Sequence, residues 1–461
     1  MSSSPDNARL TFGEKVGYGL GDMASNFYMG FFGLFLLYYY TDVFGISPAA
    51  AATMLLVTKV VDAVSDPAMG LIADRTHSRW GKYRPYLLWV AVPYAVLGYL
   101  LFLGPDFSPT GKLIYAYLTY TAVMLAYTAI NVPYSALLAV ISPVAEERTK
   151  ATQFRFVFAS LGTLCVGAFA TPLVNWLGGD NEILGFRLTI VLFAILSVAI
   201  FWLTFATTRE RVKPPRHDSS IGEDFSALLK NVSWVVLVLS GILIVVGLVA
   251  RFASIVYYVK YYLEDTGEPL FLIFDKTAVL TSCGLIGQLI GALITPLLVR
   301  YFEKNALIFA MCVLHAVTLG FCYVIPPEDF WLITGVHSIG ILTFGVTITL
   351  LFSMYTDCAE YGEWLTGNNT AGLTVSASMF SLKFGSAVGG ALPGFMLAWF
   401  GFTANTSQSE RAIEGIRLMF NIVPAVYFVA AGFLMLLYQI DRVTLQRVER
   451  ELFERRGDAV A

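Results

Sequence analysis

The sequence contains little charge and few cysteines. Only 14% of its 461 residues are charged and 57% are hydrophobic, whereas soluble domains carry about 25% charged residues. The five cysteines are odd in number and isolated, which argues against a disulfide framework or a zinc site. No basic patch suited to nucleic acid occurs, and the polar first residues lack the features of a signal peptide. We therefore expect an integral membrane protein in contact with the lipid bilayer, without a cofactor or a nucleic-acid partner.

Runs of about 20 apolar residues predict twelve transmembrane helices. They occupy residues 16–40, 48–73, 85–104, 112–142, 154–178, 184–207, 233–262, 277–302, 305–325, 329–357, 371–401 and 414–440. Basic residues concentrate after the second, fourth, sixth and twelfth runs, and acidic residues in the opposite connections. The positive-inside rule then places the N and C termini in the cytoplasm. The predicted fold class is an all-α integral membrane protein.

The most polar internal stretch divides these runs into two sets of six. A duplicated six-helix transporter predicts such a midpoint, with a substrate cavity between parallel halves. Weak internal similarity supports the duplication, because Asp66-Pro67 in the second run has a counterpart in Thr295-Pro296 of the eighth. We therefore predict an N-terminal six-helix bundle at 1–207, a cytoplasmic linker at 208–232, a C-terminal six-helix bundle at 233–441 and a cytoplasmic tail at 442–461.

Two aspartates lie inside the second apolar run. Asp62 and Asp66 share one face of a helix, and Lys59 lies one turn before Asp62. An ionised carboxylate at membrane depth costs roughly 2.5 to 3.5 kcal/mol even on insertion scales, so it is usually retained for a function. Two carboxylates beside one lysine leave a negative charge, which indicates a site for a cation or a proton. In the alternative interpretation, Lys59 and one aspartate neutralise each other and only support packing.

Other polar side chains at membrane depth indicate a ligand rich in hydroxyl groups. They are Tyr18, Asp22 and Asn26 in the first run, Tyr127, Thr128, Asn131 and Tyr134 in the fourth, and the cations Arg155, Arg251 and Lys383 in the fifth, seventh and eleventh. Carboxylate, amide and guanidinium groups beside aromatic faces suit a polyhydroxyl solute such as a sugar. Hydrogen bonding between helices is the alternative explanation.

Three motifs resemble those of a known family. They are YGLGDMASN in the first run, DAVSDPAMGLIADRTHSRWGKYRPY across the second run and its connection, and YTDCAEYGEWLTG after the tenth. In these motifs the chain resembles the glycoside-pentoside-hexuronide:cation symporters, the melibiose-permease-like branch of the major facilitator superfamily. The resemblance implies a carrier in a bacterial inner membrane, not an enzyme. It would move a small-molecule sugar or glycoside by alternating access, driven by sodium, lithium or protons.

The resemblance also implies roles for individual residues. The cation site would comprise Asp62, Ser65, Asp66 and Thr128, with Na+ as one candidate ion at the two aspartates and Lys59 beside them. The sugar site would comprise Asn26, Tyr127, Asn131, Arg155 and Lys383, to which the pattern above adds Tyr18, Asp22 and Arg251.

Departures from the melibiose-permease pattern qualify these roles. Asn26 and Asn131 replace aspartates and Ser135 replaces a tryptophan, so melibiose is not the expected substrate. Ser65 replaces an asparagine, which removes an amide oxygen ligand for sodium and favours a proton as the coupling ion.

Charged residues at the predicted cytoplasmic ends of the helices indicate a gate. The basic side consists of Arg75, Arg79, Lys82 and Arg84, and the acidic side consists of Asp357, Glu360 and Glu363, with Glu146 and Glu147 as further acids. Ion pairs between these groups would form and break as the carrier alternates between inward-closed and inward-open states. The basic connection could instead be a topogenic anchor at anionic lipid headgroups.

Three other functions are compatible with parts of the sequence. Lysolipid symporters look like the same family, and uptake of labelled glycosides against lysolipids separates the two classes. A passive channel would show uptake that ignores an ion gradient. The GLGD string at 19–22 has the GxGD form of intramembrane aspartyl proteases, but the Tyr-Asp and Pro-Ala-Leu strings of those enzymes do not occur here.

Overall fold

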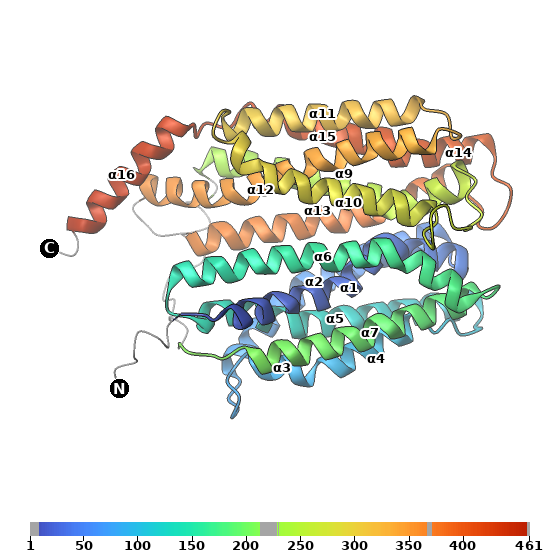
Figure 1. Ribbon diagram of the computed structural model, residues 1–461, viewed down its shortest axis with the longest axis horizontal. Helices are drawn as coiled ribbons and strands as arrows, with labels where there is room; N and C mark the ends of the chain where they lie inside the picture. The colour runs from blue at the N-terminus through green and yellow to red at the C-terminus, as the bar shows by residue number, and fades with distance from the viewer. Residues whose placement is uncertain (1–8, 213–227, 229, 367–370, 459–461) are drawn as a thin grey trace. The chain divides into compact units, whose positions relative to one another are not determined.

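The computed structural model describes residues 9–212, 228, 230–366 and 371–458, and these residues form helices without a strand among them (Figure 1). The first half of the sequence forms α1 (Phe12–Tyr38), the π-helical turn η2 (Tyr39–Val43), α2 (Pro48–Arg75), α3 (Arg84–Trp89), α4 (Ala91–Leu101), α5 (Pro109–Ile141), α6 (Ala145–Gly178) and α7 (Glu182–Thr207). The second half forms α9 (Val232–Tyr257), η3 (Tyr258–Tyr262), α10 (Lys276–Leu298), α11 (Lys304–Val324), α12 (Phe330–Thr366), α13 (Ala371–Trp399), α14 (Glu410–Arg417), η4 (Leu418–Ile422), α15 (Val423–Met435) and α16 (Arg442–Asp458).

Ten helices of the described part of the chain are long and apolar enough to cross a membrane. This confirms the predicted all-α membrane class. The third predicted run is divided between α3 and α4, and the latter has only 11 residues. The eleventh predicted run coincides with α13, which is not one of the ten. A total of twelve spans and the cytoplasmic location of both termini therefore stay predictions.

The chain divides into two compact units. Unit 1 comprises Met1–Arg216 together with Val259–Ser282 and Leu397–Ser409. Unit 2 comprises His217–Tyr258, Cys283–Met396 and Glu410–Ala461. Two segments from the second half of the sequence therefore belong to the same unit as α1 to α7. The predicted boundaries of two six-helix bundles stay predictions.

Close helix packing in unit 1 depends on glycine. The helix α1 packs against α6 and α7, α2 packs against α5, and α4 lies against α5 and α7. A Cβ atom at Gly162 of α6 would lie 2.9 Å from the Met23 carbonyl oxygen of α1. At Gly21 of α1 it would lie 2.5 Å from the Tyr134 ring of α5. Small residues at these contacts let α1 approach α5 and α6 closely enough for their polar side chains to meet.

The core of unit 2 is formed by α9, α11, α12 and α15, which pack against one another. Buried aliphatic and aromatic side chains fill it, among them Ile244, Ile308, Ile341 and Phe428. Unit 2 also contains Lys383 and Arg251, two of the predicted substrate-binding cations.

Candidate functional site

The helices α2 and α5 bring the two predicted coupling aspartates to one hydroxyl group. The Thr128 Oγ1 atom lies 2.9 Å from Asp62 Oδ1 and 3.0 Å from Asp66 Oδ1. Asp62 is only 4% exposed. A threonine hydroxyl has a single hydrogen, so it cannot donate a full hydrogen bond to two ionised carboxylates. A proton on one carboxyl group, donated to the Thr128 oxygen, would satisfy both contacts.

The other predicted members of the cation site lie on the same helix as the aspartates. Ser65 donates its hydroxyl hydrogen to the Asp62 carbonyl oxygen, 3.0 Å away, so this hydrogen is used within α2. Lys59 is half-buried one turn before Asp62. In the described part of the chain, no group of three or more His, Cys, Asp or Glu side chains could hold a metal ion. The Ser65 oxygen keeps its lone pairs, so the candidate side-chain ligands of a sodium ion are the oxygens of Asp62, Ser65, Asp66 and Thr128.

Arg155 of α6 and Asp22 of α1 form a bidentate ion pair. The Arg155 Nε atom lies 2.6 Å from Asp22 Oδ2, and Nη2 lies 3.3 Å from Oδ1. The guanidinium carbon is 4.7 Å from the centre of the Tyr134 ring, and Nη1 donates to the Tyr18 hydroxyl over 3.3 Å. The Tyr134 hydroxyl donates in turn to the Tyr18 carbonyl oxygen at 2.6 Å. This packing fixes Arg155 in place and neutralises the Asp22 carboxylate.

Three polar side chains of α5 continue this network. Asn131 donates from Nδ2 to the Tyr127 hydroxyl. Ser135 donates to Asn131 Oδ1 over 3.3 Å and accepts a hydrogen bond from Arg155 Nη2 at 3.4 Å. The part of the network nearest to solvent is Ser135, which is exposed.

Asn26 of α1 is linked to the same network through its own helix. Its Nδ2 donates to the Asp22 carbonyl oxygen at 2.8 Å, and its Oδ1 accepts from the Thr163 hydroxyl of α6 at 3.3 Å. The structure therefore brings together six predicted substrate residues, namely Tyr18, Asp22, Asn26, Tyr127, Asn131 and Arg155. Tyr134, which the sequence pattern placed on the helical face of Tyr127 and Asn131, also joins them. The sequence pointed to Ser135 only as a departure from the family pattern, and it did not indicate Thr163.

The two predicted substrate cations of unit 2 have different surroundings. Arg251 is 1% exposed, its Nη2 lies 2.7 Å from His337 Nδ1, and its guanidinium carbon is 4.4 Å from the Phe420 ring centre. Arg251 thus lies in the interior of the unit, between α9, α12 and η4. Lys383 is exposed on α13. The substrate roles of these two residues stay predictions.

The basic connection after α2 is organised by Glu210, which the sequence analysis did not identify. Its carboxylate accepts hydrogen bonds from the backbone N–H groups of Lys82, Tyr83 and Arg84 at 2.9, 2.7 and 3.0 Å. A carboxylate is favoured there because the N-terminal end of a helix carries a partial positive charge. Gly81 permits the approach, since it has φ of 109° and a Cβ atom there would lie 2.4 Å from the Glu210 carboxyl carbon.

The predicted gate residues of this connection differ in how they are held. The Arg84 side chain donates to the Phe205 carbonyl oxygen at 2.7 Å. This hydrogen bond attaches the connection to α7. Lys82 is half-buried, whereas Arg75 and Arg79 are exposed. Their proposed exchange of ion-pair partners is not tested by the geometry of unit 1 alone.

Three of the predicted gate acids have cationic partners within their own unit. In unit 2, Asp357 Oδ2 lies 2.5 Å from Lys304 Nζ, which also donates to the Ser353 hydroxyl at 3.0 Å. In unit 1, Glu147 lies 2.7 Å from Lys15 Nζ. Also in unit 1, the exposed Glu146 lies 2.7 Å from Lys150 Nζ. The other two acids of the predicted set are Glu360, which is exposed, and Glu363, which is half-buried. Pairing between the two halves stays a prediction.

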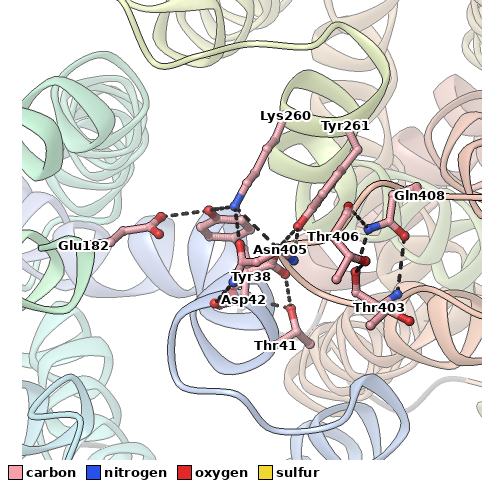
Figure 2. A network of polar contacts seen from close by, with 10 residues as sticks. All are labelled: Tyr38, Thr41, Asp42, Glu182, Lys260, Tyr261, Thr403, Asn405, Thr406 and Gln408. Atoms are coloured by element: carbon pink, nitrogen blue, oxygen red, sulfur yellow. Dashed lines mark hydrogen bonds and ion pairs between the residues drawn. The ribbon is translucent and has the colours of Figure 1, made fainter. Parts of the chain in front are cut away.

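A second polar cluster in unit 1 surrounds the Lys260 ammonium group (Figure 2). Lys260 of η3 donates from Nζ to the Tyr38 hydroxyl at 2.7 Å and to Asn405 Oδ1 at 3.0 Å, and it lies 3.6 Å from Asp42 Oδ1. Three acceptors thus match the three N–H bonds of an ammonium group. The Asp42 side chain, in η2, is fully buried.

Further hydrogen bonds fasten Asp42 to segments from the second half of the sequence. The Tyr261 hydroxyl donates to Asp42 Oδ1, and Asn405 Nδ2 donates to the Asp42 carbonyl oxygen at 2.6 Å. The Tyr38 hydroxyl donates to Glu182 Oε1 of α7 at 2.7 Å. We call Tyr38, Asp42, Lys260, Tyr261 and Asn405 the lysine cluster. In the sequence, this cluster is indicated only by the position of Lys260, a single lysine between tyrosines at the end of the seventh predicted run.

Comparison with known proteins identifies the relatives of this chain. A family described as MFS/sugar transport protein matches residues 17–442. The chain is 36% identical over 446 residues to the inner membrane symporter YicJ of Escherichia coli strain K12, with 96% of this chain and 95% of that protein covered. It is 33% identical to the putative glycoside/cation symporter YagG of the same organism, with 98% of each covered. It is 32% identical to the isoprimeverose transporter of Lactiplantibacillus pentosus, with 94% and 90% covered.

The fold is shared with solved transporter structures. A D-xylose–proton symporter superposes with a TM-score of 0.65 at 13% identity, with 92% of this chain and 97% of that chain covered. The matching family and its relatives are transporters, which confirms the prediction of a carrier and not an enzyme. They also confirm the resemblance that the three motifs indicated. The chain therefore belongs to the family of MFS/sugar transport proteins, whose members related to it include glycoside/cation symporters of the major facilitator superfamily.

Proposed function

We propose that this protein carries a glycoside into a bacterial cell together with a proton, by alternating access across the cytoplasmic membrane. The observation that carries the proposal is the position of Thr128 between Asp62 and Asp66, 2.9 and 3.0 Å from the two carboxylates. The relatives named as symporters of the inner membrane and of glycosides support the class of solute and the location.

We infer a proton as the coupling ion from the hydrogen bonds of Thr128, whose hydroxyl contacts two carboxylates but has one hydrogen. The single hydrogen of the Thr128 hydroxyl can serve only one of the two carboxylates at a time, and a second hydrogen between Thr128 and the other carboxyl group would complete both contacts. A sodium ion prefers several oxygen ligands, and this chain has the short Ser65 hydroxyl where the melibiose-permease pattern has an amide oxygen. One positive charge moving inward gains about 2.3 kcal/mol per 100 mV of membrane potential, which suffices to drive accumulation.

The solute that this surface fits is a small glycoside. Asn26, Asn131 and Ser135 present neutral donors and acceptors, and Arg155 is already paired with Asp22. A neutral, hydroxyl-rich molecule matches such groups, whereas a lysolipid would need an apolar wall for its chain. The related isoprimeverose transporter and glucuronide carrier homolog, the latter 31% identical, support a sugar or glycoside as the class of solute.

Alternating access requires the outer end of the carrier to close, and we assign this role to the lysine cluster. With the N terminus in the cytoplasm, the end of α1 that carries Asp42 faces outward. There the cluster holds residues 259–282 and 397–409 against the end of α1. Opening this end would require those hydrogen bonds to break together. The basic connection after α2 and the acids of α12 would act at the opposite end.

Uptake by membrane vesicles tests the proposal. A panel of labelled glycosides and lysolipids is offered under an imposed proton gradient in sodium-free buffer, and a protonophore is then added. We expect one class of glycoside to accumulate and its uptake to collapse with the protonophore. Strong stimulation by sodium at fixed pH and potential would overturn the proton assignment, and accumulation of lysolipids alone would overturn the sugar assignment. The variant Ser65→Asn should increase the response to sodium.

A further inference from the structure

The C-terminal helix α16 is packed against the end of α12 within unit 2. Leu445, Val448 and Leu452 are spaced along one face of α16. Val448 and Leu452 are 0% and 5% exposed, and Leu445 packs against the hydrophobic core of the unit. An apolar face that is buried in this way makes α16 a part of the folded unit.

A polar contact joins α16 to the last turn of α12. The Trp364 Nε1 atom donates to Glu451 Oε2 at 2.7 Å. The other carboxylate oxygen of Glu451 accepts from Arg447 Nε at 2.7 Å. The Arg447 guanidinium carbon also lies 5.9 Å from the centre of the Trp364 ring, within the range of a cation–π interaction. We call these three residues the α16 clasp. The clasp holds the last turn of α12 in one position against α16.

The first turn of α16 is attached to two other helices of the unit. Arg442 Nη2 donates to the Val299 and Phe302 carbonyl oxygens at 2.7 and 3.2 Å. These residues lie just after α10, where carbonyl groups lack partners within the helix and a positive charge is favourable. The Arg442 backbone N–H donates to Glu303 Oε2 at 3.2 Å, directly before α11. The helix α16 therefore links the end of α10 and the start of α11 to the end of α12.

The part of α12 that the clasp holds carries the predicted gate acids. The helix α12 has 37 residues, whereas about 20 suffice to cross the hydrocarbon core of a membrane. Its acidic residues are confined to positions 357–366, where Glu360 and Glu363 lie four residues and one residue before Trp364. A helical segment of this length is marginal in water without tertiary packing. The positions of these two acids therefore depend on what packs against the segment.

We propose that α16 is a brace for the end of α12 and that Trp364, Arg447 and Glu451 are positioning residues for the gate acids Glu360 and Glu363. The attraction between two charges weakens as they move apart, so acids that form and break ion pairs at a gate have to be held in a defined place. This inference rests on the proposed alternating access, and it does not depend on which solute or ion the protein carries.

Hydrogen exchange of the full-length protein in vesicles tests the brace. Glu451→Leu removes both contacts of the carboxylate, and Glu454→Leu is the matched control at an exposed position of the same helix. We expect the amides of residues 357–366 to exchange several-fold faster in Glu451→Leu than in the control. Glu451→Gln keeps an oxygen acceptor for Trp364 and should restore most of the protection. Equal exchange in the two leucine variants would overturn the proposal.

Reaction of a cysteine distinguishes a positioning role from a purely structural one. In inside-out vesicles, the reaction of Ser135→Cys with an impermeant maleimide measures how often the cytoplasmic end is open, and the unsubstituted protein gives the background. We expect several-fold faster reaction when Trp364→Phe is added than when Trp331→Phe is added, the same change at a tryptophan 63% exposed near the start of α12. Equal rates would overturn the positioning role. Neither measurement uses a solute or an ion gradient, so a failure of the glycoside or proton assignment would leave both results unchanged.

Discussion

Arg155 and Asp22 lie 133 residues apart in the sequence, and their side chains meet with Nε 2.6 Å from Oδ2. The pair joins α6 to α1 in the middle of the predicted substrate surface. Since both groups are about four-fifths buried, neither charge is well solvated when the other is removed. The pair therefore fixes both the packing of the two helices and the neutral character of the surface.

The first prediction concerns this pair. Asp22→Asn or Arg155→Gln should each destabilise the protein by about 1 to 3 kcal/mol, because each leaves one poorly solvated charge. The double variant should lose much less than the sum of the two. Thermal unfolding in detergent measures all three. Additive losses would show that the ion pair contributes nothing of its own.

The second prediction concerns coupling. Asp62→Asn and Asp66→Asn should abolish gradient-driven accumulation and leave sugar exchange intact, since an amide keeps the shape of the carboxyl group but cannot take up a proton. Ser65→Ala is the matched control on the same helix and should still accumulate sugar, because the Ser65 hydroxyl bonds only its own backbone in the structure. Accumulation at the normal level in either Asn variant would refute the assignment.

The third prediction concerns the lysine cluster. Lys260→Met keeps the length of the side chain but removes its hydrogen bonds to Tyr38 and Asn405. The outer end should then open more often. A cysteine at position 135 should react several-fold faster with an impermeant maleimide added outside the cell. Lys276→Met is the control, since the Lys276 ammonium group donates to the Leu263 carbonyl oxygen. Equal rates in the two variants would contradict a closing role.

The fourth prediction concerns pH. Burial raises the pKa of Asp275 from 3.8 to about 6, so the folded protein holds this proton more tightly than the unfolded chain. The resulting stability is present below about pH 4 and is lost as the pH rises through 6. The change is about 2 to 3 kcal/mol at most. Hydrogen exchange at Ala278, whose N–H binds this carboxylate, should therefore speed up from pH 4 to 6 beyond its intrinsic rate. Asp275→Asn should remove that dependence, and an unchanged pH profile would refute it.

The proximity of Asp62, Asp66 and Thr128 could be predicted because helical spacing places the two aspartates on one face and the family motifs supply the partner helix. The role of Glu210 could not be predicted from the sequence. Its carboxylate accepts hydrogen bonds from backbone groups up to 128 residues away, and the connection that contains those groups has no helical periodicity that would indicate the contact. The contacts of Lys260 could not be predicted either, because they form only where residues 259–282 and 397–409 join the first half of the sequence in unit 1. Arg251 shows a different limit. The helix α9 is apolar on every side, so periodicity could not indicate whether this arginine faces the interior of its bundle.

The π-helical turns η2 and η3 carry a consequence for how such a protein can change. A π-helical turn contains one residue more than the α-helical turn it replaces. Deleting a single codon from Tyr39–Val43 would restore an α-helical turn and leave the preceding helix in its register, because the π-helical turn absorbs its extra residue locally. Asp42 lies within this turn, so the deletion would move its side chain relative to Lys260 while α1 keeps its packing. The extra residue of η2 therefore sets where Asp42 lies relative to Lys260, and a deletion there would test that contact without disturbing the packing of α1.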